Sequence, residues 1–294
     1  MKRIAVVGVG LLGSAVASRL LQGGFQVAGY DTRPEVLQAL AGAGLRAADS
    51  IADAVRDAEL VFTVLPSLEA AEAVMSGAGG LCATAARGTV VCQMSTISPE
   101  LARRLGEAAE GAGMPFLDTP ISGTSAMVAR GDSTLLVGGD AVLAERCQPV
   151  FSAVSARTVH MGPVGAATLA KLVTNLLVAL NTAALAEALV LGEKGGLKAD
   201  KMLELLSHSA AASRMMDIRG PLMAAGDYPP QMKLDLFLKD IRLMMEAGER
   251  LGVALPLTGT AQQLYQQASL AGLDGKDLAV VKTELERMAG MAKA

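Results

Sequence analysis

Hydrophobic residues in the first half of the chain fall into short runs that alternate with amphipathic stretches. The runs are rich in Val and Ile and predict strands near 3–8, 25–31, 59–64, 89–93, 114–118, 133–138 and 156–161. Between them, helical periodicity predicts helices at 34–41, 69–75 and 99–110. Strands that alternate with helices are typical of βα units, which build a mostly parallel sheet covered by helices.

The second half has a different pattern, because the β-branched runs stop after Gly162 and Pro163. Helical periodicity then predicts helices at 164–193, 199–208, 235–251, 256–271 and 277–290. A chain of 294 residues is long enough for two domains. We therefore expect an α/β domain over residues 1–162 and an all-α domain over residues 163–294, joined by the long helix that begins near residue 164.

The N-terminal strand leads into a turn with three regularly spaced glycines. Residues 8–13 read Gly-Val-Gly-Leu-Leu-Gly, a helical stretch follows, and a second apolar run ends at Asp31. In such a strand–turn–helix unit the glycines permit a tight turn, close approach of a pyrophosphate and close packing of helix on strand. The unpaired N–H groups of the helix N-terminus favour the anion. The pattern predicts a Rossmann domain that binds a dinucleotide through Gly8, Gly10, Leu11, Leu12 and Gly13.

The same stretch shares some features with a secretory signal peptide. Lys2 and Arg3 precede an apolar run that ends at Ala15-Val16-Ala17, which resembles a cleavage site. A signal peptide does not require glycines at this spacing, or an acidic residue about twenty positions beyond the turn. Dinucleotide binding is therefore the preferred interpretation, and without a targeting segment we expect a cytoplasmic protein.

The choice between NAD and NADP depends mainly on Asp31. A carboxylate at this position accepts hydrogen bonds from a ribose 2′-OH and repels a 2′-phosphate, which favours NAD. Arg33 points the other way, because a guanidinium can pair with a phosphate. On its own, Arg33 is also explained as a solvated surface charge. We expect NAD, with NADP as the alternative.

Charge and the reactive residue types exclude several function classes. The net charge is −3, from 26 basic and 29 acidic side chains, and no basic cluster with interleaved aromatics indicates nucleic-acid binding. Three widely spaced cysteines, Cys82, Cys92 and Cys147, indicate neither a disulfide framework nor a metal cluster. His160 and His208 lack the spacing of a zinc site. We expect no metal, and catalysis by another residue type.

The tract from 164 to 191 is apolar and long enough to raise the possibility of a membrane span. Charged groups are expensive in lipid, so polar interruptions favour a helix buried between protein domains instead. The interrupting residues are Lys171, Thr174, Asn175, Asn181, Thr182 and Glu187. We expect no membrane partner.

Three segments carry candidate chemistry. Lys171 and Asn175 lie four residues apart, hence on one helix face, although a snorkelling lysine beside a hydrogen-bonded asparagine would look the same. Residues 118–123 form a small, amide-rich turn after a strand, suited to a carboxylate, or else an ordinary surface loop. Lys239 and Asp240, taken alone, are expected to be a solvated charge pair.

Two other nucleotide-binding classes fit the sequence poorly. Short-chain dehydrogenases place a catalytic Tyr four residues before a Lys, and none of Tyr30, Tyr228 and Tyr265 has a lysine at that distance. Methyltransferases that bind nucleosides more usually show G-x-G-x-G, whereas position 12 is Leu12.

Six segments in order resemble the β-hydroxyacid dehydrogenase family, which includes 3-hydroxyisobutyrate dehydrogenase and tartronate semialdehyde reductase. They are residues 8–13, 64–66, 94–99, 118–123, 162–175 and 238–240, which together span nearly the full chain. The resemblance implies an NAD(P)-dependent oxidoreductase that moves hydride between nicotinamide and a small 3-hydroxy carboxylic acid or its semialdehyde. It also implies a homodimer or homotetramer.

The resemblance assigns roles to particular residues. It makes Lys171 the general acid/base, with Asn175 placing it and the substrate, while Ser122 and Gly123 hold the substrate carboxylate. The cofactor is lined by Leu65, Pro66, Thr96 and Lys239. A lysine with the ordinary pKa of about 10.4 is a poor base at neutral pH. We therefore expect desolvation to lower the pKa of Lys171.

Two positions depart from the family pattern and bear on the substrate. Thr124 stands where a second glycine is usual, and Thr174 where an asparagine is common. A threonine at position 124 narrows the carboxylate turn or adds a hydroxyl, so Thr124 is included among the substrate residues. Two alternatives remain: an imine reductase, against which Lys171 argues, and a nucleotide-sensing protein that has lost catalysis.

Overall fold

The computed structural model describes residues 1–291. The chain divides into two compact units, Met1–Lys171 and Leu172–Ala294. Helix α9 (Ala166–Lys194) begins in the first unit and continues into the second. The division by contacts thus falls inside a helix, whereas the boundary predicted at residue 162 marks the end of the last strand.

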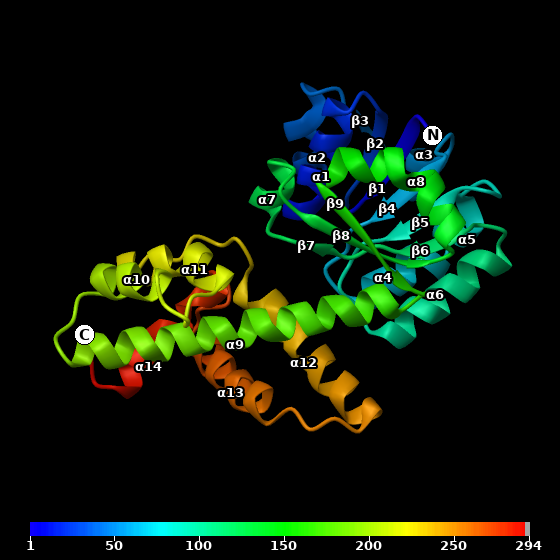
Figure 1. Ribbon diagram of the computed structural model, residues 1–294. Helices are drawn as coiled ribbons and strands as arrows, with labels where there is room; N and C mark the ends of the chain where they lie inside the picture. Colours follow the sequence, from blue (N-terminus) through cyan, green and yellow to red (C-terminus); the bar gives the residue numbers. More distant parts are fainter. Residues whose placement is uncertain (292–294) are drawn as a thin grey trace. The chain divides into compact units, whose positions relative to one another are not determined.

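The first unit is built on one sheet of nine strands (Figure 1). The strands are β1 (Arg3–Val7), β2 (Gln26–Tyr30), β3 (Arg46–Ala47), β4 (Leu60–Thr63), β5 (Val90–Gln93), β6 (Phe116–Asp118), β7 (Ile121–Ser122), β8 (Thr134–Gly139) and β9 (Arg157–Gly162). Their order is β3-β2-β1-β4-β5-β6-β8-β7, and β9 pairs with β8. The six strands from β3 to β6 in this order are parallel, whereas β8 is antiparallel to both β6 and β7. The predicted mostly parallel Rossmann sheet is confirmed.

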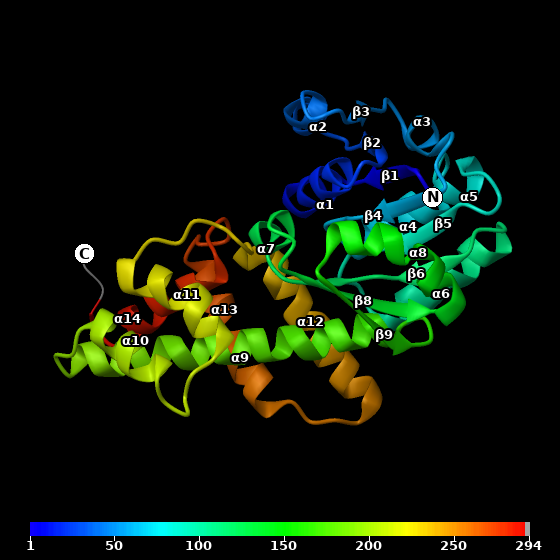
Figure 2. The same ribbon diagram turned by 45° about the horizontal axis from the view of Figure 1, so that its top comes forward.

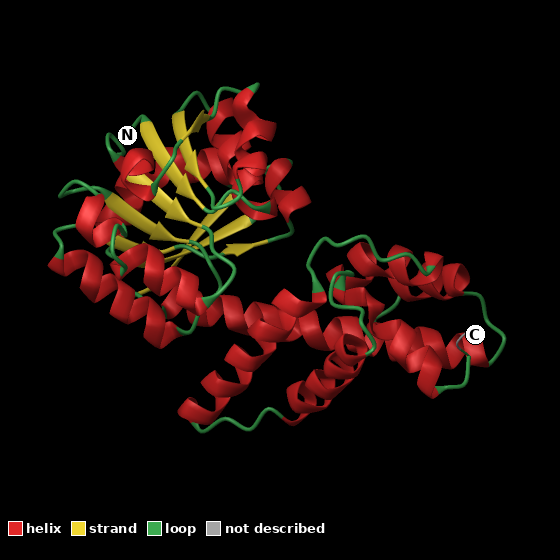
Figure 3. Ribbon diagram, turned by 180° about the vertical axis from the view of Figure 1, so that it is seen from behind, coloured by secondary structure: helices red, strands yellow, loops and turns green. Residues whose placement is uncertain are grey.

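Helices cover both faces of this sheet (Figure 3). One face packs on α1 (Leu11–Gln22), α2 (Pro34–Ala41), α7 (Ser125–Ala129) and α8 (Ala141–Val154), and the other on α3 (Ile51–Val55), α4 (Leu68–Ser76), α5 (Leu81–Thr84) and α6 (Pro99–Gly111). Strand β1 shows why both faces need to be covered, because its successive apolar side chains point to opposite faces of the sheet. Ile4 and Val6 join the first core, and Ala5 and Val7 join the second.

The second unit is all helical, as predicted. It contains most of α9, then α10 (Ala199–Ser207), α11 (Arg214–Ala225), α12 (Leu234–Leu251), α13 (Pro256–Leu270), the 3-10 turn η1 (Leu278–Val280) and α14 (Val281–Met288). In Figure 2, α10 lies beside α11, and α12 beside α13. Phe237 and Tyr265 join the latter pair edge to face at 5.8 Å, and the Tyr265 hydroxyl donates to the carbonyl of Ala179 on α9 at 2.9 Å.

A buried ion pair ties the end of the second unit to its middle. Arg219 Nε donates to Asp277 Oδ1 at 3.1 Å, and the two side chains are only 3% and 0% exposed. The same carboxylate accepts from the backbone N–H groups of Gln231, Met232 and Ala279. Because these bonds come from three separate segments, Asp277 holds α11, the loop before α12 and η1 together.

Several elements were not predicted from the sequence, and the reasons are local. Helices α8 and α11 contain Pro149 and Pro221, and an interior proline interrupts the helical signal. Helices α3, α5 and α7 have four or five residues each, too few for a period to show. The last predicted helix, 277–290, divides into η1 and α14 because Asp277 caps the 3-10 turn through Ala279 N.

Helix α9 is long and apolar enough to cross a membrane on length and composition alone, with a mean hydropathy of 1.6 over its most apolar window. The core helix of a water-soluble protein can have the same length and composition. Within the structure 44% of that window is buried, and the Ala179 carbonyl bonds to Tyr265. Length and composition therefore do not assign α9 to a membrane.

Candidate active site

The glycine turn between β1 and α1 is shaped by close backbone contacts. Gly8 has a φ of +91°, and a Cβ at this position would lie 2.1 Å from the carbonyl oxygen of Val64. A Cβ on Gly13 would lie 1.9 Å from the oxygen of Gly8. Gly10 occupies the N-cap position of α1 and supplies no side chain to its N–H groups. The turn therefore requires glycine at positions 8 and 13, as the spacing predicts.

Asp31 follows β2 and is hydrogen-bonded to the glycine turn. Its Oδ2 accepts from Val9 N at 2.8 Å, while Oδ1 accepts from Arg33 N at 3.0 Å and from Arg33 Nε at 3.2 Å. Burial acts to raise the pKa of Asp31, but the hydrogen bonds from Arg33 and Val9 outweigh it and hold the pKa below its usual value. The carboxylate is thus ionised and fixed, and Arg33 lies against it.

Leu65, Pro66 and Thr96 follow the carboxyl ends of β4 and β5. Leu65 is half-buried, and its Cδ2 lies close to Gly8, 3.3 Å from where a Cβ would be. Pro66 is exposed and Thr96 half-buried. In open α/β sheets, ligands bind outside the carboxyl ends of the strands, and these three residues lie there.

A buried hydrogen-bond network supports these loops, and its members were not predicted. Ser95 Oγ accepts from Leu65 N at 2.7 Å. Gln93 Oε1 accepts from Thr63 Oγ1 at 2.8 Å and from Ser95 N at 3.0 Å. The sequence signal that could have identified these residues is a polar residue at the end of an apolar strand, since a buried polar side chain requires hydrogen-bond partners. The network fixes the loop after β4 to the loop after β5.

The predicted carboxylate turn, Ser122-Gly123-Thr124, joins β7 to α7. Ser122 pairs with Thr134 across the antiparallel strands, and Gly123 has a φ of +147°, a conformation that favours glycine. Thr124 is the N-cap of α7, and its hydroxyl accepts from Met127 N at 3.3 Å. The added hydroxyl at position 124 therefore has a structural partner in the chain.

Lys171 and Asn175 occupy successive turns of α9 and are both buried, with 8% and 4% of their surfaces exposed. Asn175 Nδ2 donates to Asp240 Oδ2 on α12 at 2.8 Å. Lys239 Nζ lies 2.9 Å from Asp240 Oδ1. One buried carboxylate thus orients two of the predicted site residues, the amide and the second lysine.

Asp240 is the residue that the sequence interpretation missed. Taken alone, Lys239 and Asp240 were expected to form a solvated charge pair, and this is wrong, because the Asp240 side chain is 1% exposed and that of Lys239 is 19% exposed. A buried carboxylate is stable only when it is paired and hydrogen-bonded. Its partner on α9 lies 65 positions away in sequence, so no local pattern identifies it.

The predicted residues thus fall into two groups. The first unit contains the glycine turn, Asp31 with Arg33, the loops after β4 and β5, the Ser122 turn and Lys171. The second unit contains Asn175, Lys239 and Asp240.

The first group fits a nicotinamide dinucleotide. The N-terminus of α1 has no side-chain cap, so its first N–H groups are available to phosphate oxygens. Any side chain at Gly8 or Gly13 would overlap backbone oxygens. Asp31 supplies the ionised acceptor that a ribose hydroxyl requires.

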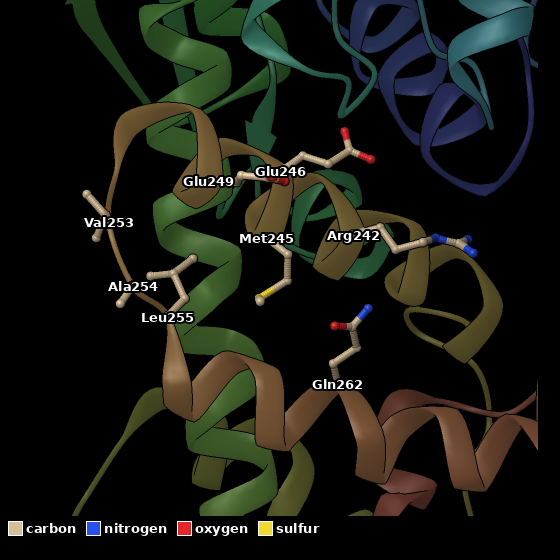
Figure 4. A pocket seen from close by; sticks show the side chains of 8 residues that line it. All are labelled: Arg242, Met245, Glu246, Glu249, Val253, Ala254, Leu255 and Gln262. Carbon is tan, nitrogen blue, oxygen red and sulfur yellow. The ribbon is translucent and has the colours of Figure 1, made fainter.

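A separate open hollow of about 460 Å³ lies between α12 and α13 (Figure 4). Arg242, Glu246 and Glu249 on its rim are solvent-exposed. None of the eight residues that line it is a predicted site residue. The hollow is thus separate from the residues to which candidate chemistry has been assigned.

Sequence profiles of known families match both halves of the chain. Residues 3–162 match the NAD binding domain of 6-phosphogluconate dehydrogenase. Residues 165–283 match the NAD-binding domain of NADP-dependent 3-hydroxyisobutyrate dehydrogenase. Use of NAD or NADP is thereby established.

Individual relatives match over almost their whole length. L-threonate dehydrogenase of Cupriavidus necator is 35% identical, over 96% of this chain and 95% of its own. The 2-(hydroxymethyl)glutarate dehydrogenase of Eubacterium barkeri is 33% identical, over 99% of this chain and 97% of its own. The structure of Mycobacterium tuberculosis 3-hydroxyisobutyrate dehydrogenase with L-serine is 30% identical with a TM-score of 0.87, over 97% of this chain and 99% of that one. The chain belongs to the β-hydroxyacid dehydrogenase family and is an NAD(P)-dependent oxidoreductase.

Proposed function

We propose that this enzyme interconverts a small 3-hydroxy carboxylic acid and the corresponding semialdehyde, with Lys171 as the general acid/base. The observation that carries the proposal is the burial of Lys171, whose side chain is 8% exposed one turn before a hydrogen-bonded Asn175. A snorkelling lysine would hold its amine in water. A lysine held inside the fold keeps its amine at a fixed position, from which it can take or return a proton.

The proton chemistry follows from this assignment. In the oxidation direction the neutral Lys171 amine takes the proton of the substrate hydroxyl as the C–O double bond forms. In the reverse direction the ammonium returns that proton to the carbonyl oxygen. The glycine turn and Asp31 would hold the dinucleotide, whose nicotinamide would supply the hydride transfer to and from the carbinol carbon. Ser122 and Gly123 are proposed to hold the carboxylate through the backbone of their turn.

Asn175 and Lys239, to which the family resemblance assigns roles in the same reaction, are both held by Asp240. Asp240 accepts from the Asn175 amide, which fixes the orientation of that side chain. Asp240 also holds Lys239 at 2.9 Å, which supports a cofactor contact by that lysine. A positioned amide orients a reacting group more precisely than a mobile one, because geometry is fixed before the reaction begins.

The substrate class rests on the chemistry that relatives share. The names of two relatives include 2-(hydroxymethyl)glutarate and L-serine, and both compounds carry a hydroxyl group on the carbon β to a carboxylate. The proposed substrate of this chain has the same arrangement. Thr124 replaces the open glycine of the family with a helix cap, so the side of the substrate near α7 is expected to be small.

We further propose NAD as the preferred cofactor, on the strength of the ionised Asp31 carboxylate. We also propose that the enzyme works in the cytoplasm as a homodimer or homotetramer, as the family resemblance implies.

The test is a panel of hydroxy acids and semialdehydes with NAD and NADP, followed by Lys171→Ala on the substrate that turns over fastest. Loss of the acid/base should lower kcat by about 10²- to 10⁴-fold. The dissociation constant of the dinucleotide should be nearly unchanged, because Lys171 is not assigned to cofactor binding.

Lys194→Ala is the matched control, since Lys194 is an exposed lysine at the end of the same helix. It should keep the activity of the natural protein. Full activity in Lys171→Ala would exclude the proposed mechanism. Nicotinamide binding without turnover of any compound in the panel would favour the nucleotide-sensing alternative.

A further inference from the structure

Asp118 is a buried carboxylate at the end of β6 to which no role has been assigned. Its side chain is completely buried, and its register partners are Gln93 on β5 and Gly138 on β8. A Cβ on Gly138 would lie 2.1 Å from Asp118 Oδ1. Only a glycine at position 138 therefore leaves room for the carboxylate.

The other oxygen of this carboxylate binds the first turn of α9. Asp118 Oδ2 accepts from Thr168 N at 2.8 Å and from Thr168 Oγ1 at 3.0 Å. The N–H groups of a first helical turn have no acceptor within the helix, and a negative charge is favourable at that end of the helix dipole. Asp118 thus caps α9 from a strand that lies 50 positions earlier in the sequence.

Capping by Asp118 costs more free energy than capping by a residue at the N-cap position. Burial raises the pKa of Asp118, and hydrogen bonds from Thr168 and from the backbone of Gly165 only partly offset that effect. Asp118 Oδ1 has no hydrogen-bond partner among residues 1–291. A Ser or Thr at the N-cap would satisfy the same N–H without burying a charge. Helix capping alone therefore does not explain why a carboxylate is buried here, whereas the two segments that it connects do.

What Asp118 joins are two parts of the proposed active site. Thr168 lies three positions before Lys171, so the two side chains are neighbours on one face of α9. On the other side, Asp118 lies four positions before Ser122, in the segment that leads to the carboxylate turn. All of these residues belong to the first unit.

We propose that Asp118 is a positioning residue: by binding Thr168 it sets where the Lys171 amine lies relative to the Ser122-Gly123 turn. The inference rests on the proposed function, because it presumes that Lys171 moves the proton. Asp118 itself does not touch the substrate or exchange a proton with it. Its effect should therefore appear in the rate of the chemical step and not in the binding of the dinucleotide.

The first test is Asp118→Asn in the full-length enzyme, with the dinucleotide and the best hydroxy acid of the panel. Displacement of a reacting group by about 1 Å can lower a rate about 100-fold, so kcat should fall about 10- to 100-fold. The KM for the dinucleotide should stay the same. Thr168→Val removes only the hydroxyl bond and should lower kcat by about 3- to 10-fold, which keeps the test decisive should the first variant fold poorly.

Asp140→Asn is the matched control. Asp140 also caps a helix with its carboxylate, by accepting from Leu143 N at 2.6 Å, but it is exposed and α8 carries no proposed site residue. This variant should keep its kcat. A parallel measurement of amide hydrogen exchange should show faster exchange at residues 167–172 in Asp118→Asn and no change there in Asp140→Asn.

Combination with Lys171→Ala separates this inference from the proposed function. If both hold, Asp118→Asn should cause little further loss in a Lys171→Ala background, because residues that act as a unit are not additive. An inactive Lys171→Ala beside fully active Asp118→Asn and Thr168→Val would overturn the positioning role alone. A fully active Lys171→Ala would overturn the proposed function instead.

Discussion

The glycine turn and the Asp240 cluster, here meaning Asn175, Lys239 and Asp240, are built in opposite ways. In the turn the absence of side chains matters, since a Cβ on Gly13 would lie 1.9 Å from a backbone oxygen. In the cluster the side chains themselves matter, because one carboxylate holds an amide at 2.8 Å and an ammonium at 2.9 Å. The first region is defined by the backbone of six consecutive residues, and the second by contacts between distant helices. Sequence motifs therefore report the first region directly and the second only through family resemblance.

Among changes in these two regions, the largest effect is expected from Gly13→Ala. The new methyl group would meet the Gly8 carbonyl, so the turn must open or α1 must move away from the sheet. We expect the affinity for dinucleotide to fall by about 100-fold or more, which corresponds to about 3 kcal/mol, together with about 1–3 kcal/mol of folding stability. Calorimetric titration and denaturant unfolding measure the two quantities.

Gly42→Ala is the control for this comparison. Gly42 has a φ of −64°, and nothing lies within 4 Å of its hypothetical Cβ. The variant should bind dinucleotide like the natural protein. Equal losses in both variants would mean that the turn is no more sensitive than an ordinary surface glycine.

A smaller effect is expected from Asp240→Ala. The change leaves Lys239 and Asn175 without their shared acceptor, and loss of one partner of a buried pair costs about 3–5 kcal/mol when both groups are buried. Because Lys239 is 19% exposed, we expect about 2 kcal/mol of stability and about a tenfold fall in kcat/KM. Glu246 on the same helix is exposed (Figure 4), so Glu246→Gln should change neither value. Unchanged kinetics in Asp240→Ala would remove the cluster from the site.

The smallest effect is expected from Asp31→Asn. Asp31 shares features of both regions, because its side chain acts through a hydrogen bond to the backbone of the glycine turn. The amide keeps an acceptor but loses the charge that repels a 2′-phosphate. The ratio of kcat/KM with NAD to that with NADP should fall about tenfold.

The pKa of Asp31 also predicts a pH dependence. Because it lies below the usual value in the folded protein, the carboxylate contributes stability above its unfolded pKa of about 3.9. This contribution is lost as the pH falls through the lowered value. The stability difference between the natural protein and Asp31→Asn should therefore be constant near neutral pH and shrink only in acid. A difference that changes between pH 6 and pH 8 would contradict this assignment.

Prediction from sequence succeeded where information is local. The periodicity around 3–8 and 25–31 identified β1 and β2, and the glycine spacing identified their turn, because strand alternation and backbone sterics act over a few residues. It failed at α8, where Pro149 masks the period. It also failed at Asp240, which was expected to be solvated. Nothing beside Asp240 in sequence marks it as buried, since the partner that makes burial possible lies on α9.

Asp277 has a consequence for the order in which the molecule assembles. Arg219, Gln231 and Met232 all bond to this one carboxylate, which is translated after them. Domains generally fold as units during synthesis, the N-terminal one first. On the ribosome the sheet can form early, whereas the helical unit lacks these bonds until Asp277 has been translated.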